Sequence, residues 1–193
     1  KVMQRAMRAM DRQLQAAWSQ RDADLSLQDM EQVRILASLI EKETGRASDR
    51  AMISSVFHNR LRLGMPLQTD PTVIYGMGSA FDGNLRRRDL RTDHPWNTYT
   101  RNGLPPTPIA MPGKAALQAA VHPAPSKALY FVARGDGSSE GLRQCQVEHV
   151  RAFGVIESDD GQPGVDLELQ RGSHGGSPDN CCRLCAGAYF RRF

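Results

Sequence analysis

Apolar residues recur every three or four positions along three stretches in the first third of the chain, which is the period of an amphipathic α-helix. The stripe in residues 2–20 contains Met3, Met7, Met10, Leu14, Ala17 and Trp18. We expect this stripe to face the core, because methionine more often fills space between helices than lines a binding surface. The second stripe contains Met30, Val33, Leu36, Leu39 and Ile40, and the third contains Met52, Ile53, Val56, Phe57 and Leu61.

Capping residues set the expected ends of the second and third helices. Ser26 and Asp29 have the spacing of a capping box, which predicts that the second helix opens there and ends near Gly45. Ser48 or Asp49 caps the third helix, and Gly64 closes it.

The middle of the chain predicts two shorter helices and a long loop region. Asp70 before Pro71 is typical of an N-cap followed by the first helical position, so a short helix is expected through Tyr75. Residues 78–111 are rich in Gly, Pro, Arg and Asp and predict a long ordered loop region, which is usually functional. A further helix opens near Pro112, and its apolar side comprises Leu117, Ala120 and Val121.

Residues 129–133 form the clearest strand pattern in the chain. Helices with one small sheet predict an α+β fold. The pattern changes after residue 140, where periodicity is lost and the cysteines begin: Cys145, Cys181, Cys182 and Cys185. We therefore expect a folded domain over residues 1–140 and a divergent tail over residues 141–193.

Composition is that of an ordinary globular domain, with 40% apolar and 24% charged residues. No stretch approaches the roughly 20 apolar residues that a membrane span needs. The net charge of +4 suits an acidic partner such as nucleic acid, anionic lipid or an anionic wall polymer. The densest basic run, residues 86–88 followed by Arg91, carries no interleaved aromatic residue and fits a solvated loop.

Glu43 continues the apolar stripe of the second predicted helix, whereas Glu41 points roughly the opposite way. At 100° per residue, Glu43 lies within about 60° of Leu36, Leu39 and Ile40. A carboxyl on an apolar face loses solvation, which raises its pKa and suits a general acid. The alternative is that Glu43, close to the helix end, bends out into water.

Two later segments are dense in hydrogen-bonding side chains with interspersed aromatic rings, as a sugar site requires. They are residues 68–75 (QTDPTVIY) and residues 97–100 (NTYT). Turn and cap chemistry is the alternative for each segment taken alone.

Eight short motifs together carry a family resemblance over about residues 30–136. They are ASLIEKET at 37–44, FHNRL at 57–61, LQTDPTVIYG at 67–76, NTY at 97–99, GLPP at 103–106, PI at 108–109, HP at 122–123 and LYFV at 129–132. In this order and spacing the chain resembles the YceG-like, or MltG, family of endolytic murein transglycosylases. The resemblance implies a helical, lysozyme-like catalytic region with a small sheet.

The resemblance also implies the site. The family's catalytic acid/base falls on Glu43, and Thr44 takes the place of the small hydroxyl residue that follows it. The residues implied to line the glycan cleft are Glu41, Gln68, Thr69, Asp70, Thr72, Tyr75, Asn97, Thr98 and Tyr99.

The activity that the resemblance implies is lytic cleavage of the MurNAc–GlcNAc β-1,4 bond, giving 1,6-anhydro-MurNAc ends without a metal or other cofactor. Its partners would be peptidoglycan glycan strands and peptidoglycan synthases, with no nucleic acid. The family's N-terminal membrane helix and adjoining small domain would place the enzyme on the periplasmic face of the inner membrane. We expect this chain to be N-terminally incomplete relative to that pattern.

The tail departs from the family pattern, and two hypotheses account for it: a shifted reading frame near Glu140, or disorder. An uninterrupted frame encoding this tail in the parent gene would contradict the first. A zinc site from Cys182 and Cys185 with His149 or His174 is weak, because structural zinc usually needs two well-spaced ligand pairs.

Two other functions compete with catalysis. A glycan-binding or scaffold domain would bind strands and release no anhydro products. A nucleic-acid-binding protein would follow from the positive charge, but no helix-turn-helix, zinc-finger or RNA-recognition pattern supports it.

Overall fold

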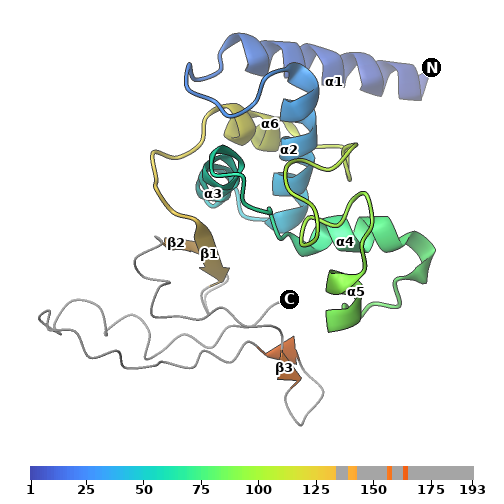
Figure 1. The fold of residues 1–193 in the computed structure, drawn as a ribbon. Helices are drawn as coiled ribbons and strands as arrows, with labels where there is room; N and C mark the ends of the chain where they lie inside the picture. Colours follow the sequence, from blue (N-terminus) through green and yellow to red (C-terminus); the bar gives the residue numbers. More distant parts are fainter. Residues whose placement is uncertain (134–138, 143–155, 158–162, 165–193) are drawn as a thin grey trace, which may run out of the picture. The chain divides into compact units, whose positions relative to one another are not determined.

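The computed structural model describes residues 1–133, 139–142, 156–157 and 163–164 (Figure 1). The chain divides into two compact units, Lys1–Ser126 and Lys127–Phe193. The helices of the first unit are α1 (Val2–Ser19), α2 (Met30–Glu43), α3 (Arg50–Arg62), α4 (Asp70–Met77), the 3-10 helix η1 (Gly78–Ala80), α5 (Arg87–Arg91) and α6 (Lys114–Val121). In the described residues, no helix is long and apolar enough to cross a membrane.

Helix α2 is the centre of the first unit and contacts α1, α3, α4 and α6. Seven of its side chains between residues 33 and 40 are buried: Val33, Ile35, Leu36, Ala37, Ser38, Leu39 and Ile40. They pack in one core with Phe57 and Ile53 from α3 and Leu117 from α6. The predicted apolar stripes of the second and third helices are therefore core-forming faces, except at Met30, which is 39% exposed.

The predicted capping box at the start of α2 is wrong. Helix α2 begins three residues later than expected, with Asp29 itself as the N-cap, whose Oδ1 accepts the Gln32 N–H at 2.8 Å. Ser26 instead bonds to Nδ1 of His58 at 2.7 Å. A buried imidazole from another helix thus takes the serine that local spacing assigned to a cap.

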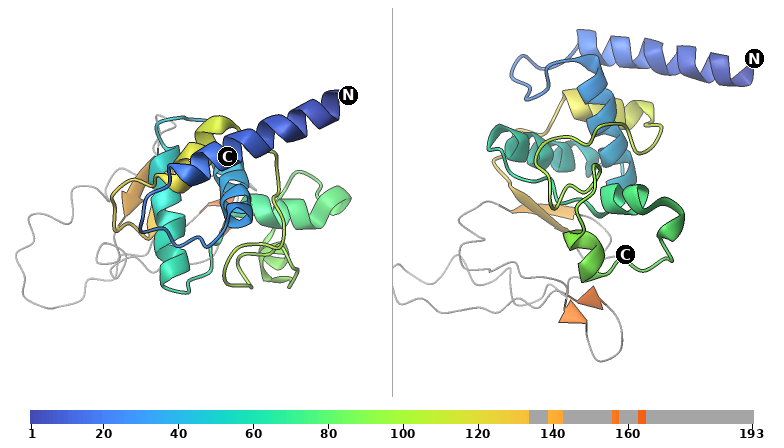
Figure 2. Two further views of the ribbon diagram at one scale, coloured as in Figure 1. Left: turned by 90° about the horizontal axis from the view of Figure 1, so that it is seen from above. Right: turned by 45° about the vertical axis from the view of Figure 1, so that its right-hand side comes forward.

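The prediction that the methionines of the first helix face the core is wrong for its N-terminal half. Met3 and Met7 are 70% and 59% exposed, while Leu14 and Ala17 near the C-terminal end are buried. Figures 1 and 2 show α1 extending past the other helices at its N-terminal end. Only the second half of α1 packs on α2 and α6.

The other predicted helices shift only at their boundaries, whereas the predicted loop region contains two short helices. Helix α4 has Thr69 as its N-cap, so Asp70 and Pro71 occupy its first two helical positions. A proline is tolerated there because the first amides of a helix have no internal partner. The predicted loop region 78–111 contains η1 and the five-residue α5 and is otherwise irregular. Helix α6 follows Gly113 as N-cap, close to the expected opening at Pro112.

The second unit contains short antiparallel strand pairs. β1 (Tyr130–Ala133) pairs with β2 (Ser139–Leu142), with Tyr130 opposite Leu142, which confirms the predicted strand at 129–133. β3 (Ile156–Glu157) pairs with β4 (Pro163–Gly164). The described part of the chain is thus mostly helical with two short strand pairs, and the α+β assignment stays a prediction. The domain boundary near residue 140 stays a prediction, and the cysteines and histidines weighed for zinc lie outside the described residues.

His58 joins three parts of the helical unit. It is fully buried, its Nε2 lies 2.9 Å from the Ala120 carbonyl of α6, and its Nδ1 faces the Ser26 hydroxyl. A carbonyl only accepts, so Nε2 carries the proton and Nδ1 accepts from Ser26. Burial lowers the pKa of His58 below its ordinary value of 6.5, despite the opposing bond to Ala120. The folded chain therefore keeps this imidazole neutral.

We expect the free energy of unfolding to fall as pH drops below 6.5. The unfolded chain takes up a proton at His58 in this range while the folded chain does not, so stability rises with pH by up to about 1.4 kcal/mol per unit until the imidazole of the unfolded chain is neutral as well, above pH 6.5. Urea unfolding between pH 7.5 and 5.5, compared with His58→Gln, isolates this contribution. Parallel profiles for the two proteins would contradict the assignment.

Candidate active site

Glu43 is the last residue of α2 and lies at the end of the buried stripe formed by Leu36, Leu39 and Ile40. Its side chain is half-buried. Thr44 is the C-cap, and its Oγ1 accepts the Arg46 N–H at 3.1 Å. Glu43 thus ends the buried stripe with its side chain neither fully buried nor fully exposed.

The carboxyl of Glu43 is held by a hydroxyl from the start of α4. Thr69 Oγ1 donates to Glu43 Oε2 at 2.5 Å. Thr69 is buried, and its own N–H donates to Thr98 Oγ1 at 3.1 Å. Thr72 Oγ1 donates to the Thr69 carbonyl at 2.7 Å and lies 2.9 Å from Thr98 Oγ1. Three buried threonines thus fix one hydroxyl against the carboxyl.

The turn that delivers Thr69 is strained and is tied to α3. Gln68 has φ +51°, in the left-handed region that non-glycine residues rarely adopt. Its N–H donates to the Thr98 carbonyl at 3.0 Å. Arg60, only 6% exposed, donates through Nη1 to the Leu67 carbonyl at 2.8 Å, with the Pro66 carbonyl at 3.3 Å and Gln68 Oε1 at 3.4 Å. A buried guanidinium therefore stabilises the backbone just before Thr69.

Asp70 and Tyr99 also meet in this region. The Tyr99 hydroxyl donates to Asp70 Oδ1, which joins the first turn of α4 to the loop after α5. Both side chains are half-buried. Asp70 directly follows Thr69 in the chain, so this bond fixes a second carboxylate next to the residue that donates to Glu43.

Asn97 organises the loop from inside. It is buried, its Nδ2 faces the carbonyls of Asp89, Leu90 and Thr92 at 2.7–3.3 Å, and its Oδ1 accepts the Tyr99 N–H at 2.9 Å. These contacts fold the loop around one amide. Both amide atoms of Asn97 thus bond to protein groups, and its predicted place in the glycan cleft stays a prediction.

An ion pair closes the same loop on its outer side. Arg101 Nε and Nη2 donate to Asp93 Oδ1 and Oδ2, each at 2.9 Å. The Arg101 bonds, together with that of Thr100, lower the pKa of Asp93 to about 2. Asp93 is therefore a carboxylate at every pH at which the protein would be used.

Glu41 is held away from the Glu43–Thr69 pair by a separate set of bonds. Its Oε2 accepts the Gly113 N–H at 3.0 Å, and its Oε1 lies 3.5 Å from Arg50 Nη2. Ser38 Oγ similarly accepts the Ile109 N–H at 3.0 Å. Two side chains of α2 thus hold the segment 109–113 that leads into α6.

Tyr75 belongs to an aromatic cluster that sequence reasoning missed in part. Its side chain is 46% exposed, and its ring centroid lies 5.8 Å from that of Trp96, which lies 5.3 Å from the His94 ring. Trp96 Nε1 donates to Thr107 Oγ1 at 3.0 Å. Local pattern did not reveal Trp96 and His94, because the cluster forms only when the loop folds back on α4.

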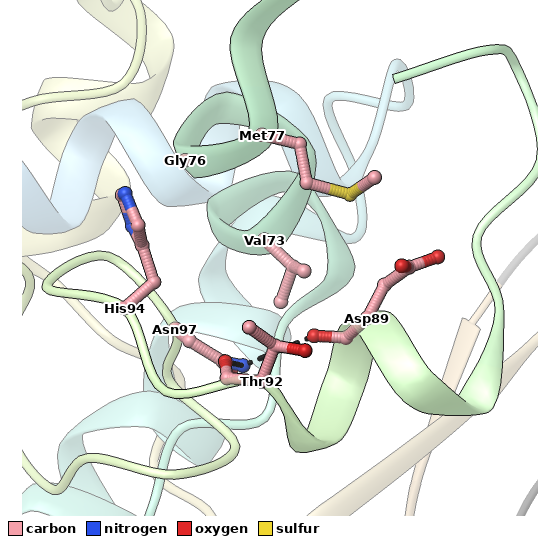
Figure 3. A pocket seen from close by; sticks show the side chains of 7 residues that line it. All are labelled: Val73, Gly76, Met77, Asp89, Thr92, His94 and Asn97. Carbon is pink, nitrogen blue, oxygen red and sulfur yellow. Dashed lines mark hydrogen bonds between the residues drawn. The ribbon is translucent and has the colours of Figure 1, made fainter. Parts of the chain in front are cut away.

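Gly76 makes that fold-back possible. A Cβ built on Gly76 would lie 2.6 Å from His94 Nδ1, so only glycine lets this imidazole reach the helix. Beside it is a small open pocket of about 200 Å³ (Figure 3). Its lining comprises Val73, Gly76, Met77, Asp89, Thr92, His94 and Asn97.

No group of three or more His, Cys, Asp or Glu side chains in the described residues has the arrangement of a metal site. What the site offers is a helix-end carboxyl with a fixed hydroxyl donor, a neighbouring carboxylate–phenol pair and exposed aromatic rings. Such a set suits proton transfer to and from an uncharged, hydroxyl-rich ligand.

Comparisons with known proteins point the same way. A family model described as the YceG-like family matches residues 1–152. The chain is 50% identical over 102 residues to a protein of Bacillus subtilis (strain 168) named endolytic murein transglycosylase, covering 53% of this chain and 28% of that protein. It is 36% identical over 102 residues to a protein of that name from Streptococcus pneumoniae serotype 2, covering 51% and 18%.

A solved structure is also similar. The crystal structure of a YceG-like protein from Listeria monocytogenes aligns with a TM-score of 0.57 and 41% identity, covering 62% of this chain and 39% of that one. The chain spans less than a third of the length of the Bacillus and Streptococcus relatives.

Proposed function

Because this chain belongs to the YceG-like family, we propose that it is the catalytic portion of an endolytic lytic transglycosylase acting on peptidoglycan. The observation that carries the proposal is the bond from Thr69 Oγ1 to Glu43 Oε2. It joins the two segments whose motifs implied the activity, and it fixes the carboxyl that the mechanism needs. The bond cleaved is the β-1,4 linkage between MurNAc and GlcNAc.

In the proposed reaction Glu43 acts first as acid and then as base. With Oε2 accepting the Thr69 hydroxyl, the acidic proton resides on Oε1 and passes to the glycosidic oxygen. Positive charge develops at the MurNAc anomeric carbon, as in other glycosidic cleavages, and the neighbouring N-acetyl group stabilises it. Glu43, now ionised, takes the proton of the 6-hydroxyl of the same sugar as that oxygen attacks the anomeric carbon. The products are a free 4-hydroxyl and a 1,6-anhydro ring, and no water is consumed.

The 6-hydroxyl competes well with water because it belongs to the same sugar. An internal nucleophile has a high effective concentration when it is correctly oriented.

We divide the other predicted site residues into two roles. In the first role are residues whose side chains are exposed or half-buried: Gln68, Asp70, Tyr75 and Tyr99. In this proposal they contact the glycan strand. Thr72, Asn97 and Thr98 are buried and position Thr69 and its loop rather than touch sugar. Glu41 has the same positioning role through Gly113 and Arg50.

The proposal extends to the wider setting by resemblance. The helical unit is lysozyme-like, the enzyme works outside the cytoplasmic membrane, on the periplasmic face of the inner membrane where there is one, and peptidoglycan synthases are its partners. Its cuts set glycan-strand length during wall assembly.

The test is mass spectrometry of purified peptidoglycan after incubation with this chain. We expect new chain ends carrying 1,6-anhydro-MurNAc. Reducing ends would show a hydrolase and exclude ring closure. Strand binding in a co-sedimentation assay without any new ends would instead support a glycan-binding or scaffold domain.

A further inference from the structure

The basic run of the sequence lies on one side of a short helix. Arg87, Arg88 and Arg91 all belong to α5, and at 3.6 residues per turn their directions fall within about 100° of arc. All three side chains are exposed, whereas Asp89 and Leu90, which occupy the remaining side of the helix, are half-buried. We call the outer side of α5, formed by the three arginines, the arginine face.

Acidic residues before and after α5 are paired with other arginines. Ahead of the helix, Asp82 Oδ2 accepts from Arg86 Nη2 at 2.6 Å. Behind it, both oxygens of Asp93 accept from Arg101. These pairs occupy the neighbouring carboxylates, so they do not neutralise the arginine face.

Arg88 and Arg91 are the members of the face whose charge is least compensated. The Arg88 side chain is 76% exposed, and its Nε lies 3.5 Å from Asp89 Oδ1, a longer separation than in the other pairs of this loop. The other oxygen of Asp89 accepts the Arg86 N–H at 2.8 Å, where it caps the helix. Among the described residues, no carboxylate lies within ion-pair distance of the exposed Arg91 side chain.

Helix stability alone does not explain this arrangement. A cation near the C-terminal end of a helix is favourable, which suits Arg91, but the first helical position disfavours one, and Arg87 lies there. Arg87 and Arg91 are also four residues apart, where like charges repel. A five-residue helix has few internal bonds to offset this repulsion. The arrangement therefore favours an anionic ligand that compensates the charge.

Bonds through the following loop tie the arginine face to the surroundings of Glu43. Asn97 Nδ2 faces three carbonyls at the C-terminal end of α5, and its Oδ1 accepts the Tyr99 N–H at 2.9 Å. The Tyr99 hydroxyl donates to Asp70, which follows the threonine that donates to Glu43. Helix α5 also contacts α4 directly (Figures 1 and 2). A strand held at Glu43 therefore has this face fixed beside it.

The guanidinium group favours carboxylates among the groups that a peptidoglycan strand carries. Its N–H donors form a planar fork that matches both oxygens of a carboxylate. The sugar hydroxyls and acetamido groups of the strand are uncharged, whereas the short peptides on its MurNAc units carry carboxylates. The peptides are therefore the part of the strand that the arginine face would attract.

We propose that the arginine face binds carboxylates of the stem peptides on the strand, so that Arg88 and Arg91 make this chain select peptide-bearing strands over peptide-free ones. The proposal rests on the proposed function for the identity of the strand. Binding of the peptides at α5 does not require turnover at Glu43.

Fluorescence anisotropy with labelled, uncross-linked strands tests binding apart from cleavage, in a Glu43→Gln background. We expect peptide-bearing strands to bind about tenfold more tightly than strands stripped of their peptides, as two exposed charge-assisted contacts allow. Arg88→Gln/Arg91→Gln should abolish this difference and leave binding of stripped strands unchanged. Equal affinities for the two kinds of strand without these substitutions would overturn the proposal.

Two matched variants separate the arginine face from net charge. Arg8→Gln/Arg12→Gln removes the same two charges from the exposed side of α1 and should keep the full preference. Arg88→Lys/Arg91→Lys keeps the charge but loses the planar fork, so it should keep only part of the preference. An equal loss of preference in the α1 variant would show that net charge, and not α5, attracts the peptides.

Competition identifies the anion. Free stem peptide should displace peptide-bearing strands, and poly(glycerol phosphate) at the same concentration of charge should displace them less. Equal displacement by both competitors would mean that the face attracts any anionic polymer, which would overturn the assignment to stem peptides.

The two proposals fail in different ways. A preference for peptide-bearing strands that depends on Arg88 and Arg91, without anhydro products from the parent chain, would retain the arginine face and reject the catalytic function. Anhydro products together with equal affinities for both kinds of strand would retain the function and reject the arginine face.

Discussion

Replacing Glu43 with glutamine is expected to lower the rate of anhydro-MurNAc formation by about 10²–10⁴-fold, the usual contribution of a positioned general acid/base. The amide keeps the size of the side chain and still accepts the Thr69 hydroxyl through its carbonyl oxygen. It carries no proton acidic enough for the glycosidic oxygen. The loss should therefore appear in kcat with KM little changed, measured by mass spectrometry of muropeptide ends over time.

The matched control for this variant is Glu31→Gln. Glu31 lies in the first turn of the same helix, is exposed and pairs with Arg34 at 2.7 Å. Its neutralisation should leave the rate within about twofold, because surface ion pairs contribute little. Full activity of Glu43→Gln would assign the acid/base elsewhere, with Asp70 as the next carboxyl to replace.

Replacing Arg60 with alanine is expected to destabilise the fold by on the order of 3 kcal/mol, because charge-assisted bonds to the Leu67 and Pro66 carbonyls are lost from a buried site. The strained backbone at Gln68 would no longer be held. Thr69 would then shift relative to Glu43, and a displacement of about 1 Å can lower turnover about 10²-fold. Urea unfolding and the anhydro assay on the same preparation measure the two effects.

Arg62→Ala is the comparison for this prediction. Arg62 ends the same helix and is more than a third exposed, with Asp24 and Asn59 as its partners. We expect a change below about 1 kcal/mol and normal turnover. If Arg60→Ala unfolds no more readily than Arg62→Ala, the guanidinium does not hold the 66–68 turn.

Local sequence patterns predicted most of the helical unit because helices depend on neighbours three and four residues apart. The stripe ending at Leu39 and Ile40 correctly predicted a buried face with Glu43 at its end. The same reasoning misassigned Ser26, whose partner His58 lies 32 residues away. The same reasoning wrongly predicted that Met3 and Met7 are buried, because a stripe indicates which face of a helix is apolar but not whether another element covers that face.

The motifs named the residues expected around Glu43, but they did not predict the contacts that each residue makes. Thr69 and Thr98 were both expected in the cleft. Thr69 donates its hydroxyl to Glu43, whereas Thr98 accepts the backbone N–H of Thr69. Arg60 was part of a motif but had no assigned role, and Trp96 was not singled out, because their contacts with residues 66–68 and 107 form only in the folded backbone. The sequence specifies which side chains carry hydroxyl groups. Tertiary packing decides which of two similar hydroxyls faces the ligand.

Because α1 is buried only in its C-terminal half, its two halves are expected to unfold differently. Opening its C-terminal half exposes Leu14 and Ala17, so those turns unfold only with the core. The turns around Met3 and Met7 lose little on opening and behave as the end of an isolated helix, which is marginal in water. Amide hydrogens there should exchange orders of magnitude faster than those near Ala17. Uniform protection along α1 in a hydrogen-exchange experiment would mean that something else covers its N-terminal half.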